Sequence, residues 1–275
     1  MSANDVGVRS NGQARPIGVK WRALVAKSVA PVGFLIFFLT AWHFLPRFVD
    51  VPSYVLPELK EVVRALFDPD ATGRYLSNAV YTLTEAGVGL LIGATAGLVI
   101  GVLLSEVTLL YRTFYPYIVA IQSIPKVALA PLFVIWFGFG IASKIVVVVL
   151  LTFFPVLVNT INGLKSVDPD QVDLFRANGA SRSQMRLKLL LPAALPSIFT
   201  GLEIAVVMAM LGAIVGEFVG AQNGLGVLIL QAQFKMQTAA VFALLIILSC
   251  IGITLNYCVR AIRRRVVFWV PGEKG

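Results

Sequence analysis

Charged residues are scarce in this sequence. Aspartate, glutamate, lysine and arginine make up 13% of the 275 residues, whereas hydrophobic residues make up 58% and the mean hydropathy is +0.85. Soluble domains are typically about one quarter charged. A soluble chain this apolar would have no means of covering its surface, so the composition predicts a protein that crosses a membrane several times.

Cysteine and histidine, which are common ligands of transition metals, are nearly absent as well. Cys250 and Cys258 lie in one apolar run without ligand-like neighbours, and the single histidine, His43, lies at the end of another. We expect packing or lipid contacts for the cysteines and an interfacial position for the histidine. No Gly-x-x-x-x-Gly-Lys-Ser/Thr motif occurs, so the chain has no phosphate-binding loop of its own. We predict no metal site, no catalytic residue and no cofactor bound by this chain.

The net charge of +9 comes from basic residues that cluster next to the apolar runs. The positive-inside rule places such clusters on the cytoplasmic side, so the charge does not indicate a nucleic-acid partner. Residues 1–25 are predicted to form a basic cytoplasmic tail. The arginine cluster at 260–265 is expected to lie against lipid headgroups and to keep the C-terminal tail, 266–275, in the cytoplasm.

Apolar runs alternate with short loops, a pattern that favours helices over a barrel, whose strands alternate in hydropathy. The predicted fold class is therefore an all-α membrane protein with both termini in the cytoplasm. A short amphipathic helix after Pro57 and a partial helix around Val227–Phe234 are expected on the outer side. Six transmembrane helices are predicted within residues 26–265, at about 26–46, 80–105, 114–137, 142–163, 193–218 and 237–259.

Glycine recurs at every fourth position of the predicted span 80–105, at Gly89, Gly93, Gly97 and Gly101. This spacing leaves one face of the helix smooth, so another helix backbone can approach it closely. We expect tight helix packing along this face, and the pairing of two copies of the chain is one use of it. Glu85, near the outer end of the same span, is expected to reach water.

Polar residues also occur within predicted spans. Charged groups in hydrocarbon are costly, so they should face the bundle interior, find partners or line an aqueous path. Prolines in span 114–137 interrupt its backbone hydrogen bonds next to such residues. For Lys126 two interpretations stay open, a substrate contact or an internal contact with a carbonyl group or with Glu203. The candidate substrate-pathway residues are Gln122, Ser123, Lys126, Glu203 and Glu217.

The longest polar interruption in the C-terminal two thirds of the chain begins at Asp168 and ends at Pro192. Asp168 with Gln171 predicts a capping box at the start of a short helix. Gly179 is expected to end that helix in a left-handed turn. Ser181 begins a second predicted capping box, and the helix that follows is expected to meet the next apolar segment at Pro192. An ordinary connecting loop is the alternative interpretation.

This segment resembles the EAA loop of permease subunits of binding-protein-dependent ABC importers. The family pattern is Glu-Ala-Ala, three residues, Gly, nine residues, then aliphatic-x-Leu-Pro; here Asp-Leu-Phe replaces Glu-Ala-Ala. The resemblance implies that the segment, 168–192, docks into a groove of a cytoplasmic ATPase subunit. The residues that this resemblance assigns to coupling are Asp173, Leu174, Phe175, Arg176, Ala177, Gly179, Ala180, Ser181, Leu189, Leu191 and Pro192.

A second stretch resembles the nitrate, sulfonate and taurine branch of the same family. The branch motif, Ile-Pro-Lys-x-Ala-x-x-Pro-Leu followed by Trp-Phe-Gly, is matched at Ile124, Pro125, Lys126, Ala128, Pro131, Leu132, Trp136, Phe137 and Gly138. The resemblance implies a type I (MetI-like) permease fold in a bacterial inner membrane. It also implies a second copy of the chain, two ATPase subunits that bind ATP and Mg, and a periplasmic or lipid-anchored substrate-binding protein.

The implied function is ATP-driven import of a small anion or organic acid by alternating access, with nitrate, taurine, an alkanesulfonate or an aromatic carboxylate as candidate substrates. Some relatives carry neutral pyrimidine or flavin compounds, so that class stays open. A transporter driven by an ion gradient is another alternative, in which Lys126, Glu203 and Glu217 would be the coupling residues. That class often carries inverted repeats, which are not evident here, and it leaves residues 168–192 without a role.

Overall fold

The computed structural model describes residues 17–49 and 51–269, with side chains from residue 31 onward except residue 47. Residues 1–16 and 270–275, which belong to the two predicted tails, lie outside the described residues. The chain forms two compact units, residues 1–60 and 61–275, and each is considered by itself. Helices joined by turns make up the described part of both units.

The first unit contains α1 (Ile17–Phe48). The described segment Pro31–Pro46 is apolar, and most of its side chains are exposed. Trp42 Nε1 donates a hydrogen bond to the carbonyl oxygen of Pro57 at 3.1 Å, which joins the end of α1 to the turn that follows.

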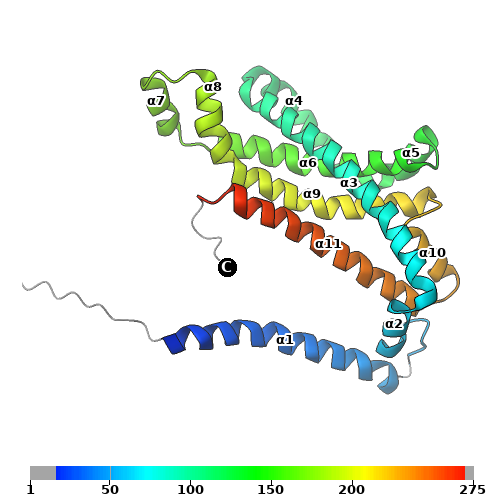
Figure 1. The fold of residues 1–275 in the computed structure, drawn as a ribbon. Coiled ribbons are helices and arrows are strands. Elements are labelled where there is room, and N and C mark those ends of the chain that lie inside the picture. The colour runs from blue at the N-terminus through cyan, green and yellow to red at the C-terminus, as the bar shows by residue number, and fades with distance from the viewer. Residues whose placement is uncertain (1–16, 50, 270–275) are drawn as a thin grey trace, which may run out of the picture. The chain divides into compact units, whose positions relative to one another are not determined.

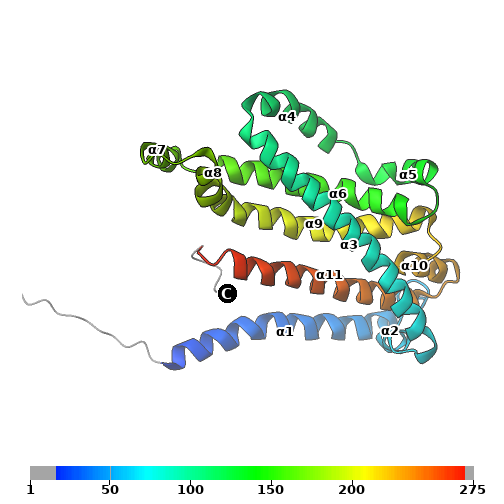
Figure 2. The same cartoon turned by 45° about the horizontal axis from the view of Figure 1, so that its top comes forward.

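The second unit is a bundle of long helices with several short ones at its ends (Figures 1 and 2). We call the end of this unit that carries α7 and α8 the loop end, and the end that carries α10 the far end. The C-terminal end of α11 lies at the loop end. In chain order the elements are α2 (Leu59–Leu66), α3 (Pro69–Glu106), α4 (Thr108–Gln122), η1 (Lys126–Leu129), α5 (Ala130–Phe137), α6 (Ile141–Lys165), α7 (Pro169–Ala177), α8 (Arg182–Met185), η2 (Arg186–Leu190), α9 (Leu191–Gly220), α10 (Leu225–Phe234) and α11 (Thr238–Val266).

Helix α3 begins well before the predicted start of its span at residue 80. Asp68 caps it, because the Asp68 carboxylate accepts a hydrogen bond from the Asp70 amide at 3.0 Å. Pro69 fits the first helical position, where its missing amide hydrogen costs nothing. These signals extend the helix beyond the apolar run from which the span was predicted.

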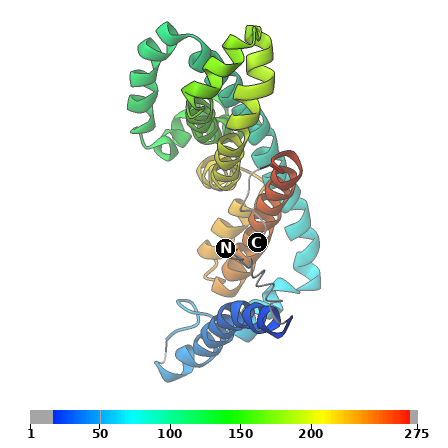
Figure 3. The same cartoon turned by 90° about the vertical axis from the view of Figure 1, so that its left-hand side faces the viewer.

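The central helix of the bundle is α6, with α3 and α9 packed along it. Seen from the loop end, α6 and α9 are viewed nearly along their axes and α11 is viewed obliquely, and α9 lies between α6 and α11 (Figure 3). In the most apolar 18-residue stretch of α6, half of the residues are buried, compared with 17% in the corresponding stretch of α11. Helix α11 therefore has the more exposed apolar surface, as expected for a helix that faces lipid.

The glycine face of α3 makes the close packing on α6 possible. A Cβ atom at Gly97 would lie 2.6 Å from the carbonyl oxygen of Phe153, and one at Gly101 would lie 2.8 Å from the Cβ atom of Thr160. Gly89 and Gly93 likewise face α6 residues. The face is thus buried against α6 of the same chain, so it is not available for pairing two copies, which was one use suggested by the sequence.

The predicted span 114–137 is not one straight helix. Helix α4 and the segment Lys126–Phe137 are bent by 81° at the break between them. Pro125 has no amide hydrogen to continue the ladder, and the residue before a proline is biased away from helical geometry. The prolines therefore produce a change of direction that hydropathy alone does not reveal.

Within the described residues, four helices are long and apolar enough to cross a membrane, and the bent pair makes a fifth candidate. They are α3, α6, the continuous helix Arg182–Gly220 and α11. The chain is therefore a multi-pass membrane protein, as its composition predicts. The remaining predicted span, 26–46, falls in α1, where side chains are described only from Pro31 onward.

Candidate functional site

Residues 168–192, which we call the coupling segment, form a helix–turn–helix at the loop end. Helix α7 is capped by Asp168, whose carboxylate accepts a hydrogen bond from the Asp170 amide at 3.0 Å. The predicted capping box with Gln171 is wrong, because the Asp168 carboxylate accepts from the amide two residues on, and the Gln171 amide donates to the Asp168 carbonyl oxygen at 3.1 Å. The helix start itself lies where the sequence predicts it.

The turn between α7 and α8 has the predicted left-handed geometry. Gly179 has a φ of +68°, and the amide of Ala180 donates to the carbonyl oxygen of Phe175 at 3.0 Å. Ser181 then forms the predicted capping box. Its amide donates to Gln184 Oε1 at 2.8 Å, and its hydroxyl accepts from the Gln184 amide at 3.3 Å. Both ends of the turn are fixed by local hydrogen bonds.

The second helix of the coupling segment runs into the membrane without a break. Helix α8 continues through η2, a single π-helical turn, into α9, so Arg182–Gly220 is one helix of 39 residues. The sequence predicted that this helix meets the next apolar segment at Pro192, and α9 begins one residue earlier, at Leu191. A proline ring crowds the carbonyl group four residues earlier, and the wider π turn accommodates it without interrupting the helix. No loop therefore separates α8 from α9.

The coupling segment is also attached to the bundle by charge. Arg186 Nη1 lies 3.2 Å from a carboxylate oxygen of Glu106, the last residue of α3. This ion pair lies in a cleft of about 690 Å³ that is also lined by Arg176, Arg182 and Leu191. Among the predicted coupling residues, Asp173, Leu174, Arg176, Ala177, Gly179 and Ser181 are exposed, and Phe175, Ala180, Leu189, Leu191 and Pro192 are half-buried.

A second candidate region is the break between α4 and α5. Lys126 Nζ donates to the carbonyl oxygen of Gln122 at 3.1 Å and lies 4.7 Å from the centre of the Phe154 ring. Gln122 and Ser123 are exposed beside it. Of the two internal contacts considered for Lys126, the carbonyl contact is present. The alternative pairing with Glu203 is wrong.

The structure does not bring the five predicted pathway residues into one site. Glu203, on α9, is paired with two arginines of α11 near the loop end. Glu217, near the end of α9, is 1% exposed at the far end. Only Gln122, Ser123 and Lys126 are neighbours, at the break described above.

Glu217 belongs to a buried polar network that fixes the start of α10. The Thr82 hydroxyl donates to Glu217 Oε1 at 2.6 Å, and the Gly226 amide donates to Glu217 Oε2 at 2.5 Å. The Thr82 hydroxyl oxygen accepts from the Leu225 amide at 2.9 Å, and Asn78 Oδ1 accepts from the Gly224 amide at 2.7 Å. Three successive amides at a helix start, which have no partner within the helix, are thus satisfied by side chains of α3 and α9.

Glycine is required at two positions of this network. Gly224 has a φ of +125°, and a Cβ atom there would overlap the Glu217 carboxylate. At Gly226 a Cβ atom would lie 2.7 Å from Glu217 Oε2. The buried carboxylate therefore occupies the space that side chains at both positions would need.

A buried cation lies next to this carboxylate. Lys144 is 2% exposed, and its ammonium group donates to the carbonyl oxygens of Phe139 at 2.5 Å, Gly140 at 2.9 Å and Gly220 at 2.9 Å. It also attracts the carboxylates of Glu85 and Glu217 electrostatically. Lys144 thus joins the α5–α6 turn to the end of α9, and its charge compensates buried negative charge.

The expectation for Glu85 was also wrong. It was expected to reach water, but it is 4% exposed, because α6 and α9 cover this face of α3. Sequence reasoning also missed Lys144, Thr82 and Asn78. A signal was available for Lys144, since a lysine only three residues into an apolar helix needs an internal partner. No local signal identifies the carbonyl groups it binds.

Comparison with known proteins identifies the family. Residues 89–268 match the family model described as "Binding-protein-dependent transport system inner membrane component". The chain is 36% identical over 243 residues to the formylaminopyrimidine transport permease protein of Halalkalibacterium halodurans, covering 88% of this chain and 96% of that one. It is 34% identical to a putative aliphatic sulfonates transport permease of Bacillus subtilis, covering 86% of each chain. The Escherichia coli taurine transport permease is 30% identical over 259 residues, covering 91% of this chain and 94% of that one.

A solved structure supports the same conclusion. The fold resembles a chain of the MetNI methionine ABC transporter in an inward-facing conformation, with a TM-score of 0.64 and 25% identity, covering 73% of this chain and 99% of that one. Membership of this family favours an ATP-driven importer over an ion-gradient-driven transporter and over an enzyme. It also implies an ATPase and a substrate-binding protein as partners. The chain therefore belongs to the membrane-spanning permease subunits of binding-protein-dependent ABC importers, within the nitrate, sulfonate and taurine branch.

Proposed function

We propose that this permease imports a small anion, such as a sulfonate or nitrate, across a bacterial inner membrane by alternating access. In this proposal two copies pair around the pathway, each with six spans and both termini in the cytoplasm. Two ATPase subunits, which bind ATP and Mg, dock on the coupling segments, and a binding protein delivers substrate from outside. The arginines at the end of α11 lie against lipid headgroups.

The observation that carries the proposal is the continuous helix from the coupling segment into α9. Closure of the ATPase subunits moves α8, and α9 transmits this movement into the membrane. Both ends of the turn before α8 are fixed by hydrogen bonds, so little of the displacement is lost in the segment itself. Opening of the pathway to the outside follows ATP binding, and hydrolysis resets it.

Docking is tested by retention of the ATPase subunit on the purified permease. Leu174 is 62% exposed on α7, in the segment that is proposed to enter the groove of the ATPase subunit. We expect Leu174→Asp and Phe175→Asp to abolish co-purification of the ATPase while the permease still reaches the membrane. Phe268→Asp is the matched control, since Phe268 is 80% exposed and lies outside the coupling segment. Retention of the ATPase by both coupling-segment variants would contradict the proposal.

The substrate class rests on the relatives and on Lys126. Relatives named for aliphatic sulfonates, taurine and nitrate favour an anion, and Lys126 at the break places a positive charge where an anion could pass. The relative named for formylaminopyrimidine makes a pyrimidine compound the second candidate. Uptake of radiolabelled taurine, nitrate and formylaminopyrimidine by the complete transporter in proteoliposomes distinguishes the two classes.

A further inference from the structure

Helix α11 is held to the rest of the bundle in two different ways along its length. Its fully buried residues, Val241, Ala243 and Leu244, all lie in its first two turns at the far end. Leu248, Ile251 and Leu255 make further apolar contacts along its middle. Towards the loop end, the described side chains of α11 are exposed or half-buried.

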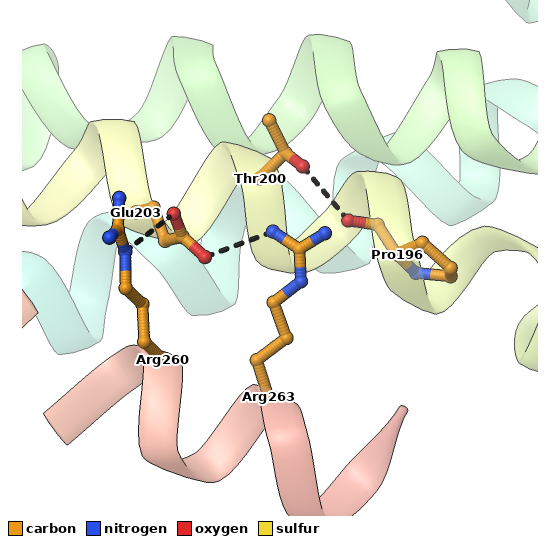
Figure 4. A network of polar contacts seen from close by, with 5 residues as sticks. All are labelled: Pro196, Thr200, Glu203, Arg260 and Arg263. Atoms are coloured by element: carbon orange, nitrogen blue, oxygen red, sulfur yellow. Dashed lines mark hydrogen bonds and ion pairs between the residues drawn. The ribbon is translucent and has the colours of Figure 1, made fainter. Parts of the chain in front are cut away.

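Near the loop end the contact between α9 and α11 is ionic. Glu203 of α9 lies between Arg260 and Arg263 of α11, and each carboxylate oxygen faces one guanidinium group (Figure 4). Arg263 Nη1 lies 2.9 Å from Glu203 Oε1, and Arg260 Nε lies 3.3 Å from Glu203 Oε2. The side chains of Glu203 and Arg263 are only 17% and 18% exposed, whereas that of Arg260 is 56% exposed. We call these three residues the α9–α11 clamp.

The position of the clamp along α9 matters for its role. Glu203 lies on the same continuous helix as α8, on the membrane side of Pro192. A displacement of the coupling segment therefore reaches Glu203 before it reaches the apolar contacts near the far end. The Thr200 hydroxyl donates to the carbonyl oxygen of Pro196 at 3.0 Å (Figure 4). Both residues lie on α9 between the coupling segment and Glu203.

We propose that Glu203, Arg260 and Arg263 are positioning residues that make the loop-end half of α11 move together with α9 during the transport cycle. The proposal rests on the proposed function, because it assumes that an ATPase subunit displaces α9. Without the clamp, α11 would remain attached at the far end, and its loop-end half would no longer be fixed to α9. A merely stabilising ion pair would leave the relative position of the two helices unchanged when it is removed.

The test measures the distance between α9 and α11 in lipid nanodiscs. Spin labels are placed on native Cys258 of α11 and on Thr200→Cys of α9, in a Cys250→Ser background. Pulsed dipolar spectroscopy is then applied to the permease alone, and to its ATPase complex with and without Mg-ATP and vanadate. Within each copy of the permease, we expect the distance between the two labels to show one narrow distribution under all three conditions.

Neutralising the clamp should release the loop-end half of α11. Glu203→Gln keeps the size of the side chain, and we expect it to raise the population of longer distances roughly two- to fivefold, as expected for a part-exposed ion pair. Arg265→Gln is the matched control, since it removes a positive charge at an exposed position of the same helix. Reversal of all three charges, Glu203→Arg with Arg260→Glu and Arg263→Glu, should restore the narrow distribution.

The outcomes separate this inference from the proposed function. An unchanged distribution in Glu203→Gln, or an equal change in Arg265→Gln, would overturn the inference even if the complex transports normally. If the ATPase subunit does not co-purify with the unmodified permease, the proposed function fails instead. The measurement on the permease alone then still decides whether the clamp fixes α11.

Discussion

Removal of the Glu217 carboxylate should destabilise the permease more than any surface substitution. In Glu217→Ala the Thr82 hydroxyl and the Gly226 amide lose their acceptor, and each buried donor left without a partner costs about 1–3 kcal/mol. Lys144 also loses one of the two carboxylates that balance its charge. The two buried donors together give an expected loss of about 2–6 kcal/mol.

Glu217→Gln separates the charge from the hydrogen bonds. The amide oxygen can still accept from the Gly226 amide, and the amide nitrogen can donate to the Thr82 hydroxyl oxygen. We expect this variant to lose about 1–2 kcal/mol, less than half the effect of alanine. The surface control is Glu106→Ala, which breaks a part-exposed ion pair with Arg186 and should cost about 1 kcal/mol or less.

The assay is reversible unfolding of the purified permease in mixed detergent micelles, followed by tryptophan fluorescence and circular dichroism. The expected order of stability is unmodified, then Glu106→Ala, then Glu217→Gln, then Glu217→Ala. Equal stabilities of Glu217→Ala and Glu106→Ala would refute the reasoning, because the buried network would then contribute no more than a surface pair.

Two further predictions concern α3 and the break between α4 and α5. Gly97→Ala should cost about 1–3 kcal/mol of stability, since its Cβ atom would lie 2.6 Å from a backbone carbonyl oxygen, whereas Gly87→Ala, which faces open space, should be neutral or slightly stabilising in the same unfolding assay. Lys126→Ala should slow substrate uptake without reducing the amount of protein in the membrane, Lys126→Arg should retain more activity than Lys126→Ala, and the exposed Lys235→Ala should have no effect. Unchanged uptake by Lys126→Ala would leave this lysine a structural role only.

The local features of the coupling segment could be predicted from the sequence. The turn at Gly179 and the capping box at Ser181 depend on residues within three positions of each other, so sequence spacing contains the necessary information. The start of α10 was predicted within two residues, although the side chains that bind its first amides come from α3 and α9. The capping of α7 was wrong only in which amide the Asp168 carboxylate accepts from.

The features that could not be predicted depend on residues distant in the chain. Lys144 binds a carbonyl oxygen 76 positions away, and Glu203 pairs with Arg263 at a separation of 60 positions. The glycine spacing of α3 predicted close packing, but nothing in the spacing says which helix approaches. The 81° bend near Pro125 depends on how the two segments pack, and the prolines only make it possible.

The most direct test of the account introduces a flexible joint between the coupling segment and α9. Leu187 and Lys188 lie in the π turn with exposed side chains, so replacing both with glycine removes little packing and weakens the helix by about 1 kcal/mol per residue. Alanine at both positions is the control, because it keeps the helix stiff. In proteoliposomes containing the complete transporter, we expect the glycine variant to hydrolyse ATP while moving much less substrate per ATP, and the alanine variant to keep the normal ratio. An unchanged ratio in the glycine variant would contradict the claim that a continuous stiff helix carries the movement.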